Sequence, residues 1–275
     1  MRLSLRSAAD AETVRDAARQ GDPDRYLAAL LAPKDFRDDL VVLAAVTGEV
    51  NRIMRVAHDP HLAEIRLQWW RDALLSPDGA ATGNPVADAF INVMQRRSLP
   101  HEDIAAWFDA RAHTFYAAPP GDDAQLELEM RLVEGTAFSL AARILDPVDD
   151  MQGMQSFITN ASVAYGLARI GADFPYWMAR GRFALPATAG RFENADARAV
   201  VAYISSTARR ALAAARAQWP RLPPRVIPAF LPLALVEPYL RALERHGHDV
   251  LHQPGEIAPL RRVARLWLAH VTRKI

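Results

Sequence analysis

Apolar residues recur at three- and four-residue spacing along almost the whole chain, and this helical periodicity constrains the fold more than any other feature. Between residues 35 and 56 one stripe carries an apolar side chain on each turn: Phe36, Leu40, Leu43, Val46, Val50 and Ile53. No segment shows the sustained apolar–polar alternation that is typical of a half-buried strand. The sequence therefore predicts an all-α protein.

Prolines and capping residues divide this pattern into separate helices. Asp22-Pro23 and Asn84-Pro85 each place a capping side chain before a first-turn proline. On these signals the expected helices span residues 9–20, 23–31, 34–56, 60–75, 85–97, 100–117, 123–146, 150–180, 193–219, 224–246 and 256–273.

Two of these helices contain internal prolines. Pro175 is expected to kink the helix over 150–180, and the prolines between 223 and 238 are expected to kink or shorten the penultimate helix. No linker is long enough to separate two domains. Residues 1–275 are therefore predicted to form a single helical domain, with residues 1–21 and 247–275 at its periphery.

Composition excludes several classes of function. The chain has no cysteine, so disulfides, thiolate catalysis and iron–sulfur clusters are ruled out. Its formal net charge of +1 lacks the basic excess of a nucleic-acid-binding domain. No apolar run reaches the about 18 residues of a spanning helix, and the N-terminus lacks the apolar core of an export signal. We expect a cytoplasmic protein that binds no nucleic acid.

Two aromatic segments are candidates for a ligand cavity. Trp69 and Trp70 point about 100° apart on a helix, so one can enter the core while the other covers a neighbouring helix. We prefer packing as the interpretation; the alternative makes either tryptophan a cavity wall with Arg66 at its polar rim. Tyr176 and Trp177 likewise suit a kinked core helix or a cavity lining.

Two further segments each allow a structural and a functional interpretation. His248 and His252 could share a helix face as metal ligands do, but the nearby glycine and proline favour a solvated turn, and no metal is expected. The helix over 256–273 has an apolar stripe and many basic residues. We prefer a terminal helix docked on the bundle; the alternative is peripheral contact with an anionic membrane, at its inner face. The stripe comprises Ile257, Leu260, Ala264, Trp267 and Val271.

Five segments between residues 22 and 245 resemble, in order, the squalene/phytoene synthase family. The Arg66–Asp72 run is the most specific part, and together with the Pro175-Tyr176 region it resembles a branch related to a mitochondrial assembly factor of respiratory complex I. The five segments are Asp24-Arg25-Tyr26-Leu27; Leu31-Ala32-Pro33 with Arg37; Glu64-Ile65-Arg66-Leu67-Gln68-Trp69-Trp70-Arg71-Asp72; Glu134-Gly135-Thr136-Ala137; and Gly181-Arg182-Phe183-Ala184-Leu185-Pro186.

This resemblance implies an isoprenoid-synthase-like helical bundle around a central apolar cavity. Active members of the family condense two prenyl diphosphates head to head. Their Mg²⁺ ions require hard oxygen ligands, which the family supplies as aspartates at i and i+4 on two helices.

This sequence departs from both aspartate motifs. The first region contains one carboxylate, Glu49, together with Arg52 and Arg55. In the second, Asp173 falls on the first aspartate position, while Tyr176 and Trp177 occupy the places of the later acidic pair. One carboxylate per helix is too few to hold a cluster of divalent ions.

The sequence therefore predicts a non-catalytic member of the family, one that binds an isoprenoid lipid and acts in the assembly of a respiratory complex. Two alternatives stay open: an active prenyl transferase using Mg²⁺ and prenyl diphosphates, and a structural partner protein with a filled core. No cofactor is expected outside the transferase alternative. The residues expected around the cavity and its mouth, including the remnants of both motifs, are Glu49, Arg52, Arg66, Trp69, Trp70, Phe138, Asp173, Tyr176 and Trp177.

Overall fold

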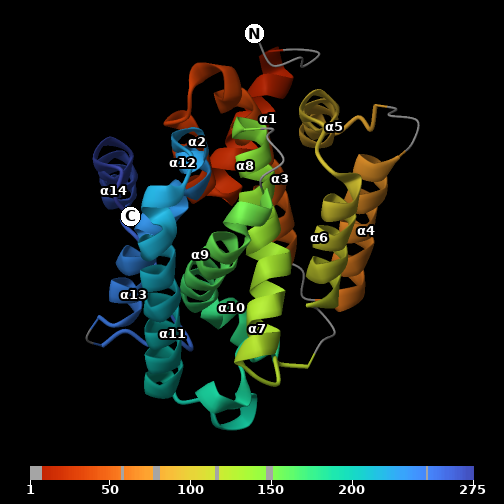
Figure 1. Ribbon diagram of the computed structural model, residues 1–275. Helices are drawn as coiled ribbons and strands as arrows, with labels where there is room; N and C mark the ends of the chain where they lie inside the picture. Colours follow the sequence, from red (N-terminus) through yellow and green to blue (C-terminus); the bar gives the residue numbers. More distant parts are fainter. Residues whose placement is uncertain (1–7, 57–58, 77–80, 115–117, 147–150, 246) are drawn as a thin grey trace. The chain divides into compact units, whose positions relative to one another are not determined.

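The computed structural model describes residues 8–56, 59–76, 81–114, 118–146, 151–245 and 247–275. Every regular element in these ranges is a helix (Figure 1), so the predicted all-α class is confirmed. The chain divides into two compact units. A single domain over residues 1–275 stays a prediction, and each unit is described separately.

Unit 1 comprises residues 1–116, 136–149 and 224–229. Its helices are α1 (Ala8–Gly21), α2 (Pro23–Leu30), α3 (Lys34–Val56), α4 (Pro60–Leu75), α5 (Pro85–Arg97), α6 (His101–His113) and α8 (Thr136–Leu145), with the short 3₁₀ turn η5 (Pro224–Val226) and most of α12 (Ile227–Phe230).

Unit 2 comprises residues 117–135, 150–223 and 230–275. Its α-helices are α7 (Asp123–Met130), α9 (Met151–Ala172), α10 (Phe174–Met178), α11 (Ala197–Gln218), α13 (Val236–Leu243) and α14 (Pro259–Thr272). The remaining elements are the π-helical turn η1 (Arg131–Gly135) and the 3₁₀ turns η2 (Ala187–Ala189), η3 (Phe192–Asn194), η4 (Trp219–Arg221) and η6 (Leu231–Leu235).

Helix α3 forms the centre of unit 1, where α1, α2, α5 and α8 pack on it. Its apolar stripe, which the sequence pattern predicts, is buried as far as Val50 and Ile53. Residues 8–21, placed at the periphery by sequence, form α1, whose Val14 and Ala18 are fully buried. In unit 2 the corresponding central helix is α9, which contacts α7, α11 and α13 and lies beside α11 in Figure 1.

Capping explains where several helices begin. The Asp22 and Asn84 side chains accept backbone N–H bonds at the first turns of α2 and α5, each with proline at a first helical position. Asp59 does the same for α4. These starts agree with the sequence prediction because cap and proline are local signals.

Three expected helices are interrupted. The helix over 150–180 breaks into α9 and α10, since Pro175 lacks the N–H that would continue the ladder. The stretch over 123–146 contains the π turn η1, and the proline-rich stretch after 223 alternates 3₁₀ and α turns, as its spacing predicts. One described segment, Pro224–Leu243, is apolar and long enough to cross a membrane, but 89% of its window is buried, as in a core helix.

Candidate functional site

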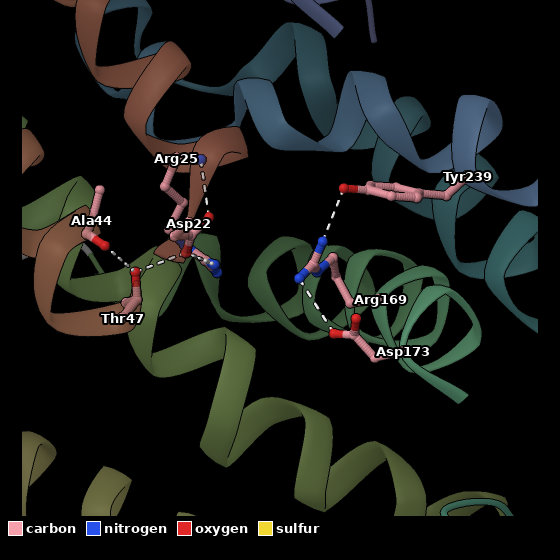
Figure 2. A network of polar contacts seen from close by, with 7 residues as sticks. All are labelled: Asp22, Arg25, Ala44, Thr47, Arg169, Asp173 and Tyr239. Carbon is pink, nitrogen blue, oxygen red and sulfur yellow. Dashed lines mark hydrogen bonds and ion pairs between the residues drawn. The ribbon is translucent and has the colours of Figure 1, made fainter. Parts of the chain in front are cut away.

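The first cluster of interest joins the start of α2 to α3 inside unit 1 (Figure 2). Asp22 Oδ1 caps α2, while its Oδ2 accepts hydrogen bonds from Arg25 Nη1 at 3.0 Å and Thr47 Oγ1 at 2.7 Å. Arg25 also lies over the Phe138 ring, with Cζ 5.2 Å from its centroid. The ion pair is buried, so breaking it would weaken the compensation of the charge that remains.

Close backbone packing explains the glycine that precedes Glu49. A Cβ atom added to Gly48 would lie 2.9 Å from Gly21 Cα and 3.0 Å from the Ala17 carbonyl oxygen. Only glycine allows α1 and α3 to approach this closely. Thr47 and Gly48, in the region where the family resemblance places an aspartate motif, therefore hold unit 1 together.

Glu49 on α3 is half-buried, with its side chain 19% exposed. Its Oε2 pairs with Arg52 Nη2 at 2.6 Å, and the Arg52 side chain is mostly exposed. This is an i,i+3 pair on one helix face. The one carboxylate of the first motif region is therefore already paired with a cation.

The second cluster lies around the end of α9, in unit 2 (Figure 2). Arg169 Nη2 contacts Asp173 Oδ2 at 3.3 Å, and Arg169 Nη1 donates to the Tyr239 hydroxyl at 2.9 Å. Arg262 Nη2 lies 3.3 Å from the same hydroxyl. Asp173 and Arg169 are half-buried, so solvent reaches this pair more easily than it reaches Asp22.

A left-handed glycine ends α10 directly after the second motif region. Gly181 has φ +67°; its N–H donates to the Met178 carbonyl, and the Arg182 N–H donates to the Trp177 carbonyl. These bonds form a Schellman cap, which favours glycine at that position. Tyr176 is exposed and Trp177 half-buried. The glycine of the Gly181–Pro186 segment thus has a local structural role.

The α4 run has three distinct faces. Trp70 is buried in unit 1 at 4% exposure, whereas Trp69 is 43% exposed and meets Trp70 edge-to-face at 5.3 Å. Arg66 is exposed. A third face borders a groove of about 330 Å³ toward α6, where Arg71 pairs with Asp109 at 2.9 Å. The preferred packing interpretation thus describes Trp70, while Trp69 faces solvent.

The structure gathers only some of the predicted site residues. Phe138 is fully buried beside Arg25, and Glu49 pairs with Arg52. The sequence pattern does not indicate Thr47, whose partner Asp22 is 25 residues away, or Tyr239, which is 70 residues from Arg169. The sequence indicates that Asp22 caps a helix, but it does not indicate the hydrogen bond between Thr47 and Asp22.

The two histidines that suggested a metal lie in turns. His252 Nδ1 is 2.7 Å from Asp249 Oδ2, and this hydrogen bond lowers the pKa of the Asp249 carboxyl. Over the described part of the chain, no group of three or more His, Asp or Glu side chains is arranged to hold a metal ion.

The donor set does not fit the Mg²⁺ cluster of a prenyl transferase. Glu49 and Asp173 are single carboxylates. Glu49 pairs with Arg52 on the same helix, and Asp173 pairs with Arg169, one turn before it. Magnesium ions need several hard oxygen ligands in octahedral array. Guanidinium groups beside the carboxylates would instead repel a cation.

Two kinds of known protein are similar to this chain, one by sequence and one by structure. Rat and human NADH dehydrogenase (ubiquinone) complex I, assembly factor 6 (Rattus norvegicus, Homo sapiens) are 23% and 22% identical, over 90% of this chain and 79% of each relative. The crystal structure of a dehydrosqualene synthase in complex with ligand superposes with a TM-score of 0.79 at 14% identity, covering 96% of both chains.

Squalene synthase HpnC from Alicyclobacillus acidocaldarius superposes with a TM-score of 0.67 at 20% identity, over 90% of this chain and 95% of that one. At these identities the likeness shows the fold, and confirms the predicted isoprenoid-synthase architecture. The squalene/phytoene synthase family model matches residues 18–266. The helices, the Gly181 segment and this match together show that the chain belongs to the squalene/phytoene synthase family.

Proposed function

We propose that this protein is a non-catalytic member of its family, which binds an isoprenoid lipid and acts in the cytoplasm in the assembly of respiratory complex I. The observation that carries the proposal is the pairing of each remnant carboxylate with an arginine: Glu49 with Arg52 at 2.6 Å and Asp173 with Arg169 at 3.3 Å.

The requirements of prenyl diphosphate ionisation support the proposal that this protein is not a catalyst. Ionisation at an allylic carbon leaves charge on the diphosphate, which divalent ions must neutralise. Arginines can bind a diphosphate by bidentate hydrogen bonds, but their charge is fixed and they gather no metal. Arg52 and Arg66, both exposed, suit binding of a prenyl diphosphate without metal-assisted cleavage.

The lipid part of the proposal rests on aromatic side chains. Within unit 1 the candidate lining residues are Trp69, Trp70 and Phe138, and within unit 2 they are Tyr176 and Trp177. Large aromatic rings provide the apolar area that a prenyl chain would bury. Mass spectrometry of an organic extract of the purified protein tests this part. An isoprenoid recovered in near-stoichiometric amount is expected; a lipid-free protein would favour a structural partner with a filled core.

The assembly role rests on the relatives named complex I assembly factor 6. Deletion of the gene is expected to lower NADH:quinone oxidoreductase activity and the amount of assembled complex I in membranes. Expression of the unaltered chain should restore both. Normal complex I in the deletion strain, with altered squalene or carotenoid content, would favour the transferase alternative.

One assay tests catalysis directly. The purified protein is incubated with farnesyl or geranylgeranyl diphosphate, with and without Mg²⁺, and released diphosphate and lipid products are measured together. No turnover is expected from protein whose folding has been verified, beside an active squalene synthase as control. Product that depends on Mg²⁺ would overturn the non-catalytic proposal.

A further inference from the structure

Helix α14 packs on the rest of unit 2 through two buried apolar residues and two half-buried arginines. Leu266 and Ala269 are buried and face η6. Arg262 is half-buried with its guanidinium 3.3 Å from the Tyr239 hydroxyl, and Arg265 Nη2 lies 3.5 Å from a backbone oxygen of η6. A helix docked by its hydrophobic stripe would have the opposite orientation.

The C-terminal end of α14 is fixed as well. Trp219 Nε1 donates to the Arg273 carbonyl at 2.8 Å, and Arg216 Nε donates to the backbone oxygen of Ile275 at 2.7 Å. These bonds hold the end of the helix to η4 and α11, so its rotation about its own axis is set by unit 2.

Most of the exposed side chains of α14 are consequently apolar. Leu260 is 86% exposed, and Trp267 and Val271 are each 57% exposed. The preferred sequence interpretation, in which this stripe docks on the bundle, is wrong for these residues, because the helix is turned the other way. We call this surface the α14 stripe: Leu260, Val263, Ala264, Trp267, Leu268 and Val271.

A basic pocket of about 290 Å³ lies along one flank of the stripe. Its polar lining consists of Arg216, Arg241, Arg261, Arg265 and a single carboxylate, Glu237. That carboxylate already accepts a hydrogen bond from Arg209 at 3.0 Å. We call this site the arginine pocket; its excess of guanidinium groups suits a phosphate monoester or diester.

We propose that the α14 stripe and the arginine pocket form one docking surface for an anionic phospholipid membrane. The stripe enters the boundary between headgroups and acyl chains, as interfacial helices with Leu and Trp on one face do. The arginine pocket receives a lipid phosphate at the same level. Arg261 and Arg265 connect the two features, since they lie on α14, which carries the stripe, and line the pocket.

The charge and the types of side chain on this surface favour a membrane over a protein as its partner. Interfacial helices combine an apolar face with flanking cations, and anionic lipids attract those cations. Arg261, on the edge of the stripe, is exposed and has no ion-pair partner within the ranges that the structure describes. Trp267, near the middle of the stripe, is the side chain that interfacial helices favour at headgroup level.

Co-sedimentation with vesicles tests the proposal. The full chain is mixed with vesicles of phosphatidylcholine alone or of phosphatidylcholine with phosphatidylglycerol, at low and high salt. Strong binding is expected only to the anionic vesicles, and it should weaken at high salt. Leu260→Glu/Val271→Glu and Arg241→Glu/Arg261→Glu should each lower the partition coefficient about tenfold or more.

Matched controls keep the result interpretable. Leu128→Glu changes an exposed apolar residue on α7 and should leave vesicle binding unchanged. Circular dichroism melts verify that each variant folds, which is expected because the replaced side chains face solvent. Loss of binding in Leu128→Glu as well would show a non-specific effect and overturn the proposal.

Other outcomes identify other occupants. Equal partition of the unaltered chain onto neutral and anionic vesicles, or no binding to either, would overturn the proposal. A dimer in analytical ultracentrifugation that Leu260→Glu/Val271→Glu dissociates would assign the stripe to a second copy of the chain. Stabilisation by inorganic phosphate without vesicle binding would make the pocket a site for free anions.

Discussion

The two polar clusters in Figure 2 use similar groups at different depths. Side chains of Asp22 and Arg25 are at most 8% exposed, whereas Arg169 and Asp173 are 16% and 23% exposed. A buried pair depends on its geometry, because neither charge has water to replace a lost partner. A shallower pair can exchange partners with solvent or a ligand. We therefore expect the first cluster to contribute more to the stability of unit 1 than the second contributes to that of unit 2.

Asp22→Ala is expected to have the largest effect, a loss of about 3–5 kcal/mol in the free energy of unfolding. The substitution removes the α2 cap, the Thr47 hydrogen bond and the partner of buried Arg25. Denaturant titration followed by circular dichroism measures the loss. Asp16→Ala is the matched control, since Asp16 forms an exposed pair with Arg19 at 2.8 Å and should cost less than about 1 kcal/mol. Equal losses of unfolding free energy in both variants would contradict the expectation that the buried pair stabilises the fold more than the exposed pair.

Gly48→Ala tests the same region through packing alone. We expect a loss of about 2 kcal/mol, because the new Cβ would contact backbone atoms of Gly21 and Ala17 that have no room to move. The loss would appear despite a gain of about 1 kcal/mol in helix propensity. Thermal and urea melts measure it.

Gly135→Ala is the control for Gly48→Ala. Its Cβ would meet only side chains, at 3.5 Å or more, and stability should change little. A neutral Gly48→Ala would mean that α1 and α3 separate easily, which contradicts the close backbone contact.

The sequence predicts the helices well because their signals are local. Asp22, Asp59 and Asn84 cap the first turns of helices whose first residues are prolines. The apolar stripe of α3 repeats with the helical period, so its burial follows from spacing. The break before α10 follows from Pro175, although the sequence alone suggests a kink rather than two helices.

Pairings between distant residues are not encoded in local pattern. Thr47 and Asp22 meet only because α1 and α3 pack through Gly21 and Gly48. The orientation of α14 is a second case. Its sequence contains one apolar stripe and several arginines, and periodicity cannot say which side faces the protein. Contacts of the Arg262 and Arg265 guanidinium groups with Tyr239 and Ala234, elsewhere in unit 2, accompany the observed orientation.

Asp173→Ala tests the more exposed cluster, so that its stability loss can be compared with that of Asp22→Ala. We expect a stability loss of about 1 kcal/mol, since Arg169 keeps the Tyr239 hydroxyl as an acceptor at 2.9 Å. The free energy of unfolding and the binding of farnesyl diphosphate are measured together. If the cluster binds a diphosphate, loss of the Asp173 carboxylate removes a negative charge beside Arg169 and should tighten diphosphate binding.

Tyr239→Phe serves as the comparison for Asp173→Ala, because it removes the hydroxyl while keeping the ring that lies 5.5 Å from Arg169 Cζ. A loss of several kcal/mol for Asp173→Ala would place this cluster in the same structural class as Asp22.

Glu49→Ala is expected to have the smallest effect. Its partner Arg52 is 63% exposed, and such a pair on one helix face contributes about 0.3–0.5 kcal/mol. Arg52→Ala should cost the same small amount, because each variant removes the same contact. Isothermal titration with Mg²⁺ should give no binding heat that Glu49→Ala abolishes, since an arginine beside a lone carboxylate opposes a divalent ion. Mg²⁺ binding that depends on Glu49 would instead indicate that α3 contributes a ligand to a metal site. That result would favour the prenyl transferase alternative.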